Sequence, residues 1–293
     1  MGLVDYPDSE DEDAEPVKTP PAKRRKLSTS EGVALPPLPA AFLDQYSSTV
    51  RTSTQDEPSM HGGKKRVTPH VEGNWPAHVY LEWHPTPNEH DLLSKLVTAT
   101  QPTGDQSKAE KDASHVHSLL ENDLGVALAL HISLSRPLVL KTAQKDSYLT
   151  HLQKFITENS IKALTLQPKD LAWHPNESGS RWFLVVRLQK SAELDKLLQT
   201  CNEVAKAFKQ PLLYAETDKP KGDEFHISIA WSLQAPRKKG TSSKISRSDS
   251  LTEQDIGIPY SLLQRLSSLE ISFAEVKVRI GQDVNLVGLK PKR

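Results

Sequence analysis

The chain has 293 residues, with 37 acidic and 37 basic side chains and a single cysteine, Cys201. One cysteine excludes internal disulfide bonds and a zinc site built of several thiolates, and it favours a reducing compartment. No apolar stretch is long enough to cross a membrane and the acidic start is unlike a signal peptide, so we expect no membrane association. The length allows one elaborated domain or two small ones.

Residues 1–72 are predicted to be a disordered tail. They are rich in proline, serine, threonine and charge, and they contain too few clustered hydrophobic residues to offset the entropy of ordering. An acidic block at residues 10–13 is followed by a Lys-Arg-Arg-Lys cluster at residues 23–26. Such a cluster is typical of a nuclear import signal, and the alternative is a solvated run of charge.

Residues 73–293 are predicted to form the folded body. Alternating apolar and polar residues indicate strands, whereas apolar residues three or four apart indicate helices, the clearest of which has Ser191 as its N-cap. A lysine- and serine-rich segment at 236–256 is expected to be a flexible surface insertion. The order strand, helix, strand, helix recurs roughly, which favours a two-lobed α+β domain. The expected strands are 77–83, 126–134, 163–172, 181–188, 225–233, 269–280 and 284–289, and the expected helices are 91–97, 148–156, 194–208 and 260–266.

The tripeptide His-Ile-Ser occurs twice, 95 residues apart, in apolar stretches that are predicted to be buried strands. The chain has eleven histidines, and only His131 and His226 have a serine two residues later, Ser133 and Ser228. Side chains alternate between the faces of a strand, so each histidine shares a face with its serine. The alternative is that both are core strands with inert, hydrogen-bonded histidines.

Two such pairs facing each other can hold one phosphate between two imidazoles. One histidine would take the proton from the 2′-hydroxyl of RNA and the other would protonate the departing 5′ oxygen, since both forms of histidine are populated near neutrality. Ser133 and Ser228 are expected to donate to the non-bridging oxygens. A serine nucleophile is disfavoured because RNA carries its own. No spacing offers three or four zinc ligands, so we expect neither metal nor cofactor.

Paired His-x-Ser motifs on strands of a two-lobed domain resemble the two-histidine (2H) phosphoesterase superfamily. Within it, the stretch 73–80 and the two motif strands resemble the family of U6 small nuclear RNA phosphodiesterases, over about residues 75–289. The resemblance implies a pseudo-symmetric α+β fold, with antiparallel sheets lining a central groove and helices outside. It carries over His131 and His226 as catalytic residues, and Ser133 and Ser228 as phosphate-stabilising residues.

The same resemblance implies a function. It is that of a nuclear, metal-independent 3′-to-5′ exoribonuclease, which trims the uridine tail of U6 RNA and leaves a 2′,3′-cyclic phosphate or its opened product. The expected substrate is the single-stranded 3′ end of RNA rather than DNA, and the expected state is a monomer. Two alternatives stay open: a 2H phosphodiesterase acting on other RNA ends, and an inactive RNA-binding adaptor. Which histidine is the base also stays open.

Two aromatic residues flank the second motif. In the family resembled, an aromatic residue shortly before this motif stacks on the terminal base, and the expected counterpart is Tyr214, twelve residues before His226. The alternative is a tyrosine of the core. Trp231 has the same parity along the strand as Ile227 and Ile229, so it is expected to pack in the core.

Overall fold

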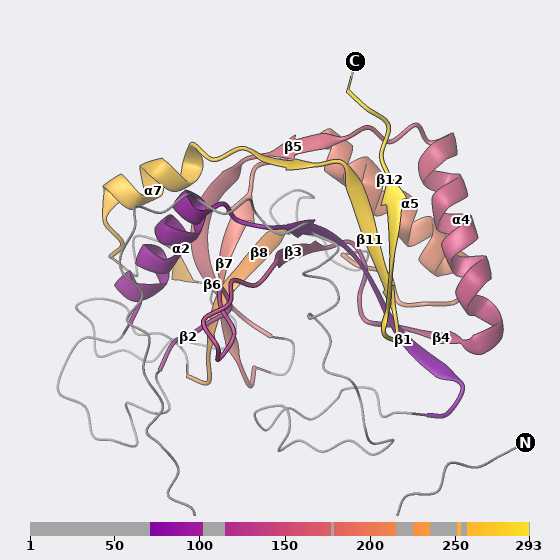
Figure 1. Ribbon diagram of the computed structural model, residues 1–293, viewed down its shortest axis with the longest axis horizontal. Helices are drawn as coiled ribbons and strands as arrows, with labels where there is room; N and C mark the ends of the chain where they lie inside the picture. Colours follow the sequence, from indigo (N-terminus) through magenta and orange to yellow (C-terminus); the bar gives the residue numbers. More distant parts are fainter. Residues whose placement is uncertain are drawn as a thin grey trace, which may run out of the picture. The chain divides into compact units, whose positions relative to one another are not determined.

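The computed structural model describes residues 71–101, 115–176, 179–214, 225–234, 251–252 and 257–292. Nearly all of the predicted tail and of the predicted insertion at 236–256 lies outside these residues. The described part contains two five-stranded sheets, a two-stranded sheet and helices (Figure 1). The helices are α2 (Pro87–Ala99), η2 (Thr142–Gln144), α4 (Lys145–Glu158), α5 (Ala192–Ala207) and α7 (Tyr260–Ser267).

The first sheet has the strand order β12-β11-β1-β3, and β4 pairs with the other end of β1. All of its pairings are antiparallel. Its long central strand therefore carries three neighbours, with β3 and β4 sharing one edge. Its strands are β1 (Asn74–Trp83), β3 (Leu130–Ser133), β4 (Leu138–Lys141), β11 (Glu275–Ile280) and β12 (Asp283–Gly288).

The second sheet has the strand order β2-β8-β7-β6-β9 and is also antiparallel. A separate pair, β5 with β10, forms the two-stranded sheet. The strands of the second sheet are β2 (His117–Ser118), β6 (Pro168–Pro175), β7 (Trp182–Leu188), β8 (His226–Ser232) and β9 (Leu251–Thr252). Those of the small sheet are β5 (Leu164–Leu166) and β10 (Ile271–Phe273).

Each large sheet has one apolar face, which packs against helices. In β1 the buried residues are Ala77, Val79, Leu81 and Trp83, and the residues between them are partly exposed. Figure 1 shows α4 and α5 beside the first sheet, and α2 and α7 beside the second. The other face of each sheet is thereby left for polar side chains. The α+β class with antiparallel sheets and outer helices is confirmed.

Local sequence signals mark the starts of α5 and α2, although α2 begins at Pro87 and not at the predicted residue 91. Ser191 caps α5, because its hydroxyl accepts a hydrogen bond of 3.2 Å from the backbone N–H of Leu194. Helix α2 begins with a capping box, in which Thr86 and Glu89 each accept from the other's backbone N–H. The predicted N-cap of α5 is therefore confirmed.

The first motif strand is shorter than predicted. It was expected over 126–134 but begins at Leu130. The preceding residues form a turn, because the side-chain oxygen of Asn122 accepts hydrogen bonds of 3.0 Å from the backbone N–H groups of Leu124 and Val126. Similarly, the expected strand at 163–172 is divided between β5 and β6, which belong to different sheets.

Trp75 is held firmly at one end of β1. Its indole Nε1 donates to the hydroxyl of Thr142 at 3.0 Å, and the Lys145 ammonium lies 3.8 Å from the centroid of its ring. Gly281, in the turn between β11 and β12, approaches the same ring with φ +64°. A Cβ at Gly281 would lie 2.7 Å from the Cε3 atom of Trp75.

We expect Gly281→Ala to lower the free energy of unfolding by about 2 kcal/mol or more, because it adds a clash to the left-handed backbone strain. Gly73→Ala is the matched control: Gly73 has φ +81° with nothing within 4 Å of a Cβ, so only the backbone cost of about 1 kcal/mol is expected. Urea denaturation of both variants measures the difference. Equal losses would show that the Trp75 contact is unimportant.

Candidate active site

Polar side chains gather on one face of the first sheet because β1 alternates polar and apolar residues. Cross-strand pairing places Tyr80 opposite Ser133, and Glu82 opposite His131. On the other side of β1, the same face continues onto β11. Residues paired in this way lie side by side on one face of a sheet. This polar face consists of His78, Tyr80, Glu82, His131, Ser133, Lys277 and Arg279.

His78 contacts both residues of the first motif. Its Nε2 lies 3.1 Å from the hydroxyl oxygen of Ser133, and its ring is edge-on to that of His131 with centroids 5.5 Å apart. Tyr80 stacks on His78 at 5.2 Å and meets His131 edge-on at 5.8 Å. The two rings from β1 therefore fix the orientation of the His131 imidazole.

Burial, together with the positive charges of His131 and Arg279, lowers the pKa of His78 to about 4, and burial is the largest cause. His78 is therefore neutral near pH 7. A neutral imidazole has one N–H donor and one acceptor nitrogen. If Nε2 carries the hydrogen and donates to Ser133, the hydroxyl hydrogen of Ser133 is left for another acceptor.

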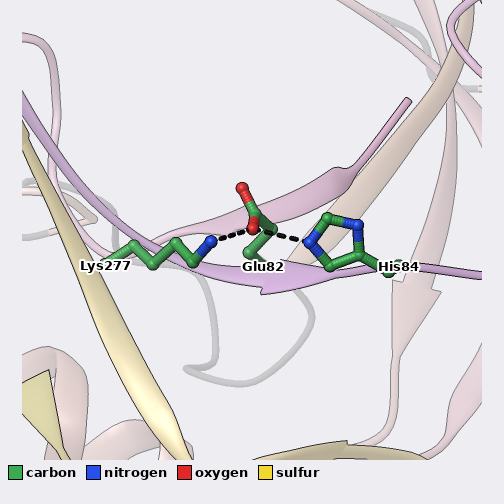
Figure 2. Close-up of polar contacts among 3 residues, drawn as sticks. All are labelled: Glu82, His84 and Lys277. Atoms are coloured by element: carbon green, nitrogen blue, oxygen red, sulfur yellow. Dashed lines mark hydrogen bonds and ion pairs between the residues drawn. The ribbon is translucent and has the colours of Figure 1, made fainter. Parts of the chain in front are cut away.

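Glu82 is the acidic group of this polar face. Figure 2 shows Lys277 and His84 approaching its carboxylate from opposite sides. The Lys277 ammonium donates to the oxygen Oε2, and the Nε2 atom of His84 lies 2.8 Å from the same oxygen. Burial would raise the pKa of Glu82, but the hydrogen bonds with His84 and Lys277 lower it overall. Glu82 is therefore ionised at neutral pH.

The pKa of His131 is determined by opposing effects. His131 keeps an exposed surface, yet the surrounding protein removes much of the hydration of its ring, which lowers its pKa. The charge of His226 lowers it further, whereas the Glu82 carboxylate raises it. Charged groups on both sheets thus shift the pKa of His131.

The second motif lies on the polar face of the second sheet. His226 is opposite Arg187, whose guanidinium binds the Asp170 carboxylate through two hydrogen bonds of 2.5 and 2.6 Å. The ring of His174, from β6, is stacked with that of His226 at a centroid distance of 6.4 Å. Ser228 is two residues further along β8, on the same face as His226.

The two motifs meet where the two sheets adjoin. Strand β3 packs against β8, and both are seen side by side at the centre of Figure 1. His226 is near enough to His131 to affect its pKa. The structure thus brings together the two motif strands and their histidines, His131 and His226, although the strands belong to different sheets.

Tyr214 lies beside the start of β8, the strand that carries the second motif. Its ring meets that of Phe225, the residue preceding His226, edge-on at 5.7 Å. Asn202 of α5 holds the neighbouring backbone, because its side-chain amide exchanges hydrogen bonds of 2.9 and 3.0 Å with Leu213. The location is compatible with base stacking, and that role stays a prediction.

Trp231 does not pack in the core, and that expectation was wrong. Ser228 pairs with Val185 and Ala230 pairs with Leu184, so Ile229 is an extra residue in β8. After this β-bulge, the residues of β8 point to the opposite face of the sheet from the one that simple alternation predicts. Trp231 consequently lies on the polar face and is partly exposed, whereas Ile229 and Ala230 are both buried.

His78, Glu82 and His174 were not identified as site residues from the sequence. The signal for the first two was present, because His78, Tyr80 and Glu82 alternate with apolar residues in a predicted strand. His174 lies beyond the strand expected over 163–172, but β6 continues to Pro175 and includes it.

Two antiparallel sheets each bring one His-x-Ser strand to a shared junction, which is the arrangement expected from the resemblance to the two-histidine phosphoesterases. The fold resembles that of Kluyveromyces marxianus Usb1 with uridine monophosphate, at a TM-score of 0.52 and 16% identity, over 73% of this chain and 98% of that one.

The HVSL family model, described as an uncharacterised conserved protein, matches residues 36–287. The chain is 32% identical over 295 residues to U6 snRNA phosphodiesterase 1 of Neurospora crassa, covering 94% of this chain and 79% of the relative. It is 26% identical over 243 residues to U6 snRNA phosphodiesterase 1 of Homo sapiens, covering 78% of each. The chain belongs to the HVSL family and to the family of U6 snRNA phosphodiesterases.

The lowered pKa of His78 predicts a pH-dependent stability. Between its unfolded pKa of 6.5 and its folded pKa of about 4, the unfolded chain binds a proton that the folded protein does not. The free energy of unfolding should therefore fall as the pH drops through this range, by about 3 kcal/mol at pH 4. Well above pH 6.5, His78 is neutral in both states and this loss is absent.

Urea denaturation at pH 7 and at pH 4.5 measures this loss. His78→Gln should reduce the difference between the two pH values, and His151→Gln, on the exposed side of α4, should leave it unchanged. An undiminished pH dependence in His78→Gln would mean that other groups cause it.

Proposed function

We propose that this protein is a 3′-to-5′ exoribonuclease that trims the uridine-rich end of U6 small nuclear RNA. The observation that carries the proposal is the meeting of two His-x-Ser strands, β3 and β8, at the junction of the two large sheets. The relatives named U6 snRNA phosphodiesterase 1 support the choice of substrate. The solved relative that holds uridine monophosphate supports a uridine end.

In the proposed reaction the RNA supplies the nucleophile. The 2′-hydroxyl of the penultimate nucleotide attacks the last phosphodiester, the bond to the 5′ oxygen of the terminal nucleotide breaks, and a 2′,3′-cyclic phosphate remains. One of His131 and His226 accepts the 2′ proton, and the other protonates the leaving 5′ oxygen. Glu82 supports this chemistry by opposing the two effects that lower the pKa of His131. No metal or cofactor is required.

The two serines stabilise the negative charge on the phosphoryl oxygens. For Ser133 to donate, its hydroxyl hydrogen must point to the substrate. A neutral His78 that donates from Nε2 to the Ser133 oxygen enforces this orientation. His78 is thus a positioning residue for Ser133.

We further propose that Tyr214 stacks on the terminal base, a contact that contributes about 1–3 kcal/mol. Asn202 holds the Tyr214 loop, which keeps the ring at the start of β8. The enzyme is proposed to act as a monomer in the nucleus, with the basic cluster at residues 23–26 as the import signal. Among the described residues, no helix is long and apolar enough to cross a membrane.

We expect His131→Ala and His226→Ala each to lower the rate of trimming by about 10²–10⁴-fold, because each removes one proton-transfer group. The double variant should lose little more than either single variant, since the two residues act as a unit. The assay follows shortening of a 5′-labelled oligouridine in excess EDTA, with His151→Ala as the control. A folded His226→Ala variant with normal trimming, or activity that requires added zinc or magnesium, would contradict the proposal.

A 2′-deoxy substitution tests the nucleophile directly. Placed on the penultimate nucleotide, it removes the attacking hydroxyl, so cleavage of the last phosphodiester should stop while binding changes little. The same substitution on the terminal nucleotide leaves the nucleophile and should permit one cut. Cleavage at the normal rate across the penultimate deoxy linkage would indicate attack by water or serine instead.

A further inference from the structure

A second cluster of aromatic and basic side chains lies beyond Ser228 on the polar face of the second sheet. The Trp231 ring is stacked on that of His117, with centroids 4.1 Å apart and an interplanar angle of 14°. The guanidinium carbon of Arg181 lies over the Trp231 ring, 4.6 Å from its centroid. His115 meets His117 edge-on at 4.7 Å.

The cluster is built by three separate structural features. The β-bulge at Ile229 turns Trp231 to the polar face, and the pairing of β2 with β8 places His117 opposite Trp231. The β6–β7 turn brings in Arg181, whose backbone N–H donates to the Asn176 side chain at 3.1 Å, while its carbonyl accepts from the Asn176 N–H at 2.9 Å. All three aromatic or basic side chains remain partly exposed.

The cluster and Tyr214 lie at opposite ends of β8. Tyr214 contacts Phe225, just before the strand, whereas Trp231 is three residues after Ser228, or roughly 10 Å at the ordinary rise of a strand. If the terminal base lies on the Tyr214 side of the motif histidines, the RNA must leave the site in the other direction. That direction leads along β8 to Trp231.

The chemistry of the cluster fits nucleotides. Arginine stacked on an aromatic ring keeps its N–H donors in the plane of the guanidinium, where they can bind phosphate oxygens. Flat aromatic and guanidinium surfaces also stack on any base, which suits a single strand held without sequence readout. His117 has a lowered pKa, from partial burial and from the charges of His115 and Arg181, so its ring stacks uncharged.

We propose that His117, Arg181 and Trp231 form a binding site for the nucleotides upstream of the penultimate one, with stacking and phosphate contacts that set the direction of the RNA. The inference rests on the proposed exoribonuclease function and adds to it a substrate requirement. RNA that extends past the penultimate nucleotide engages the cluster, and the dinucleotide UpU does not reach it. A preference for longer RNA follows.

The test compares kcat/KM for pentauridine with kcat/KM for UpU. In the wild-type protein this ratio should be well above one. In Trp231→Ala and in Arg181→Gln it should fall by about tenfold, because stacking and a phosphate contact are lost only for the longer RNA. Tyr260→Ala, an exposed aromatic residue on α7, is the matched control and should keep the wild-type ratio.

Binding provides a second readout. Fluorescence anisotropy with labelled pentauridine, on proteins that also carry His226→Ala, gives the dependence of affinity on salt. Loss of one phosphate contact in Arg181→Gln should reduce the log–log slope by about 0.7. Arg181→Lys should restore part of the slope, because the charge is retained.

The possible failures are distinguishable. A wild-type ratio near one, or equal losses for pentauridine and UpU in both variants, would overturn the upstream site and leave the exoribonuclease proposal intact. Wild-type protein that cleaves neither RNA would overturn the proposed function and the upstream site with it.

Discussion

The antiparallel register of β1 between β3 and β11 is the constraint on which the first half of the site depends. It sets Glu82 opposite His131 and Tyr80 opposite Ser133, and it continues the polar face to Lys277. A slip of one residue in either pairing would move every polar side chain of a strand to the apolar face. The burial of Val79 and Leu81 against the helices opposes such a slip, so hydrophobic packing on one face holds the chemistry on the other.

On the polar face, one carboxylate, Glu82, accompanies the positive charges of Lys277 and Arg279. Lys277 is almost completely buried, and the Glu82 carboxylate is the partner that compensates its charge. Removing one member of a buried ion pair costs about 3–5 kcal/mol, because the other charge stays behind in a poorly hydrated place. Glu82 therefore links stability to electrostatics: the group that neutralises Lys277 also raises the pKa of His131.

Much of the fold could be predicted from the sequence because its signals are local. Alternation identified β1 and β8, and the spacing of leucines with Ser191 identified α5. The pairing of His131 with His226 could be predicted because the same tripeptide occurs in two apolar strands. The contact of His78 with Ser133 depends on which strands are neighbours, which no local pattern specifies.

Other errors arose from single residues that interrupt a regular pattern. Asn122 closes a turn with its side chain and so shortens the first motif strand. Ile229 sits as the extra residue of a bulge, although its own side chain is as apolar as its neighbours. The rule that alternate residues of a strand share a face holds only where neighbouring strands pair residue by residue. A bulge interrupts this pairing, and it leaves no mark in the hydrophobicity of the sequence.

The bulge at Ile229 has a consequence for how such a protein can change during evolution. A core residue and an exposed residue of a strand normally change places through substitutions at both positions, which alter the amino-acid composition of both faces. Here the face on which Trp231 lies depends on the number of residues between it and Ser228. Insertion or loss of one residue in this short stretch would move a large aromatic ring between the interior and the surface. Strand length thus offers a route to new surface chemistry that leaves the rest of the strand's amino acids unchanged.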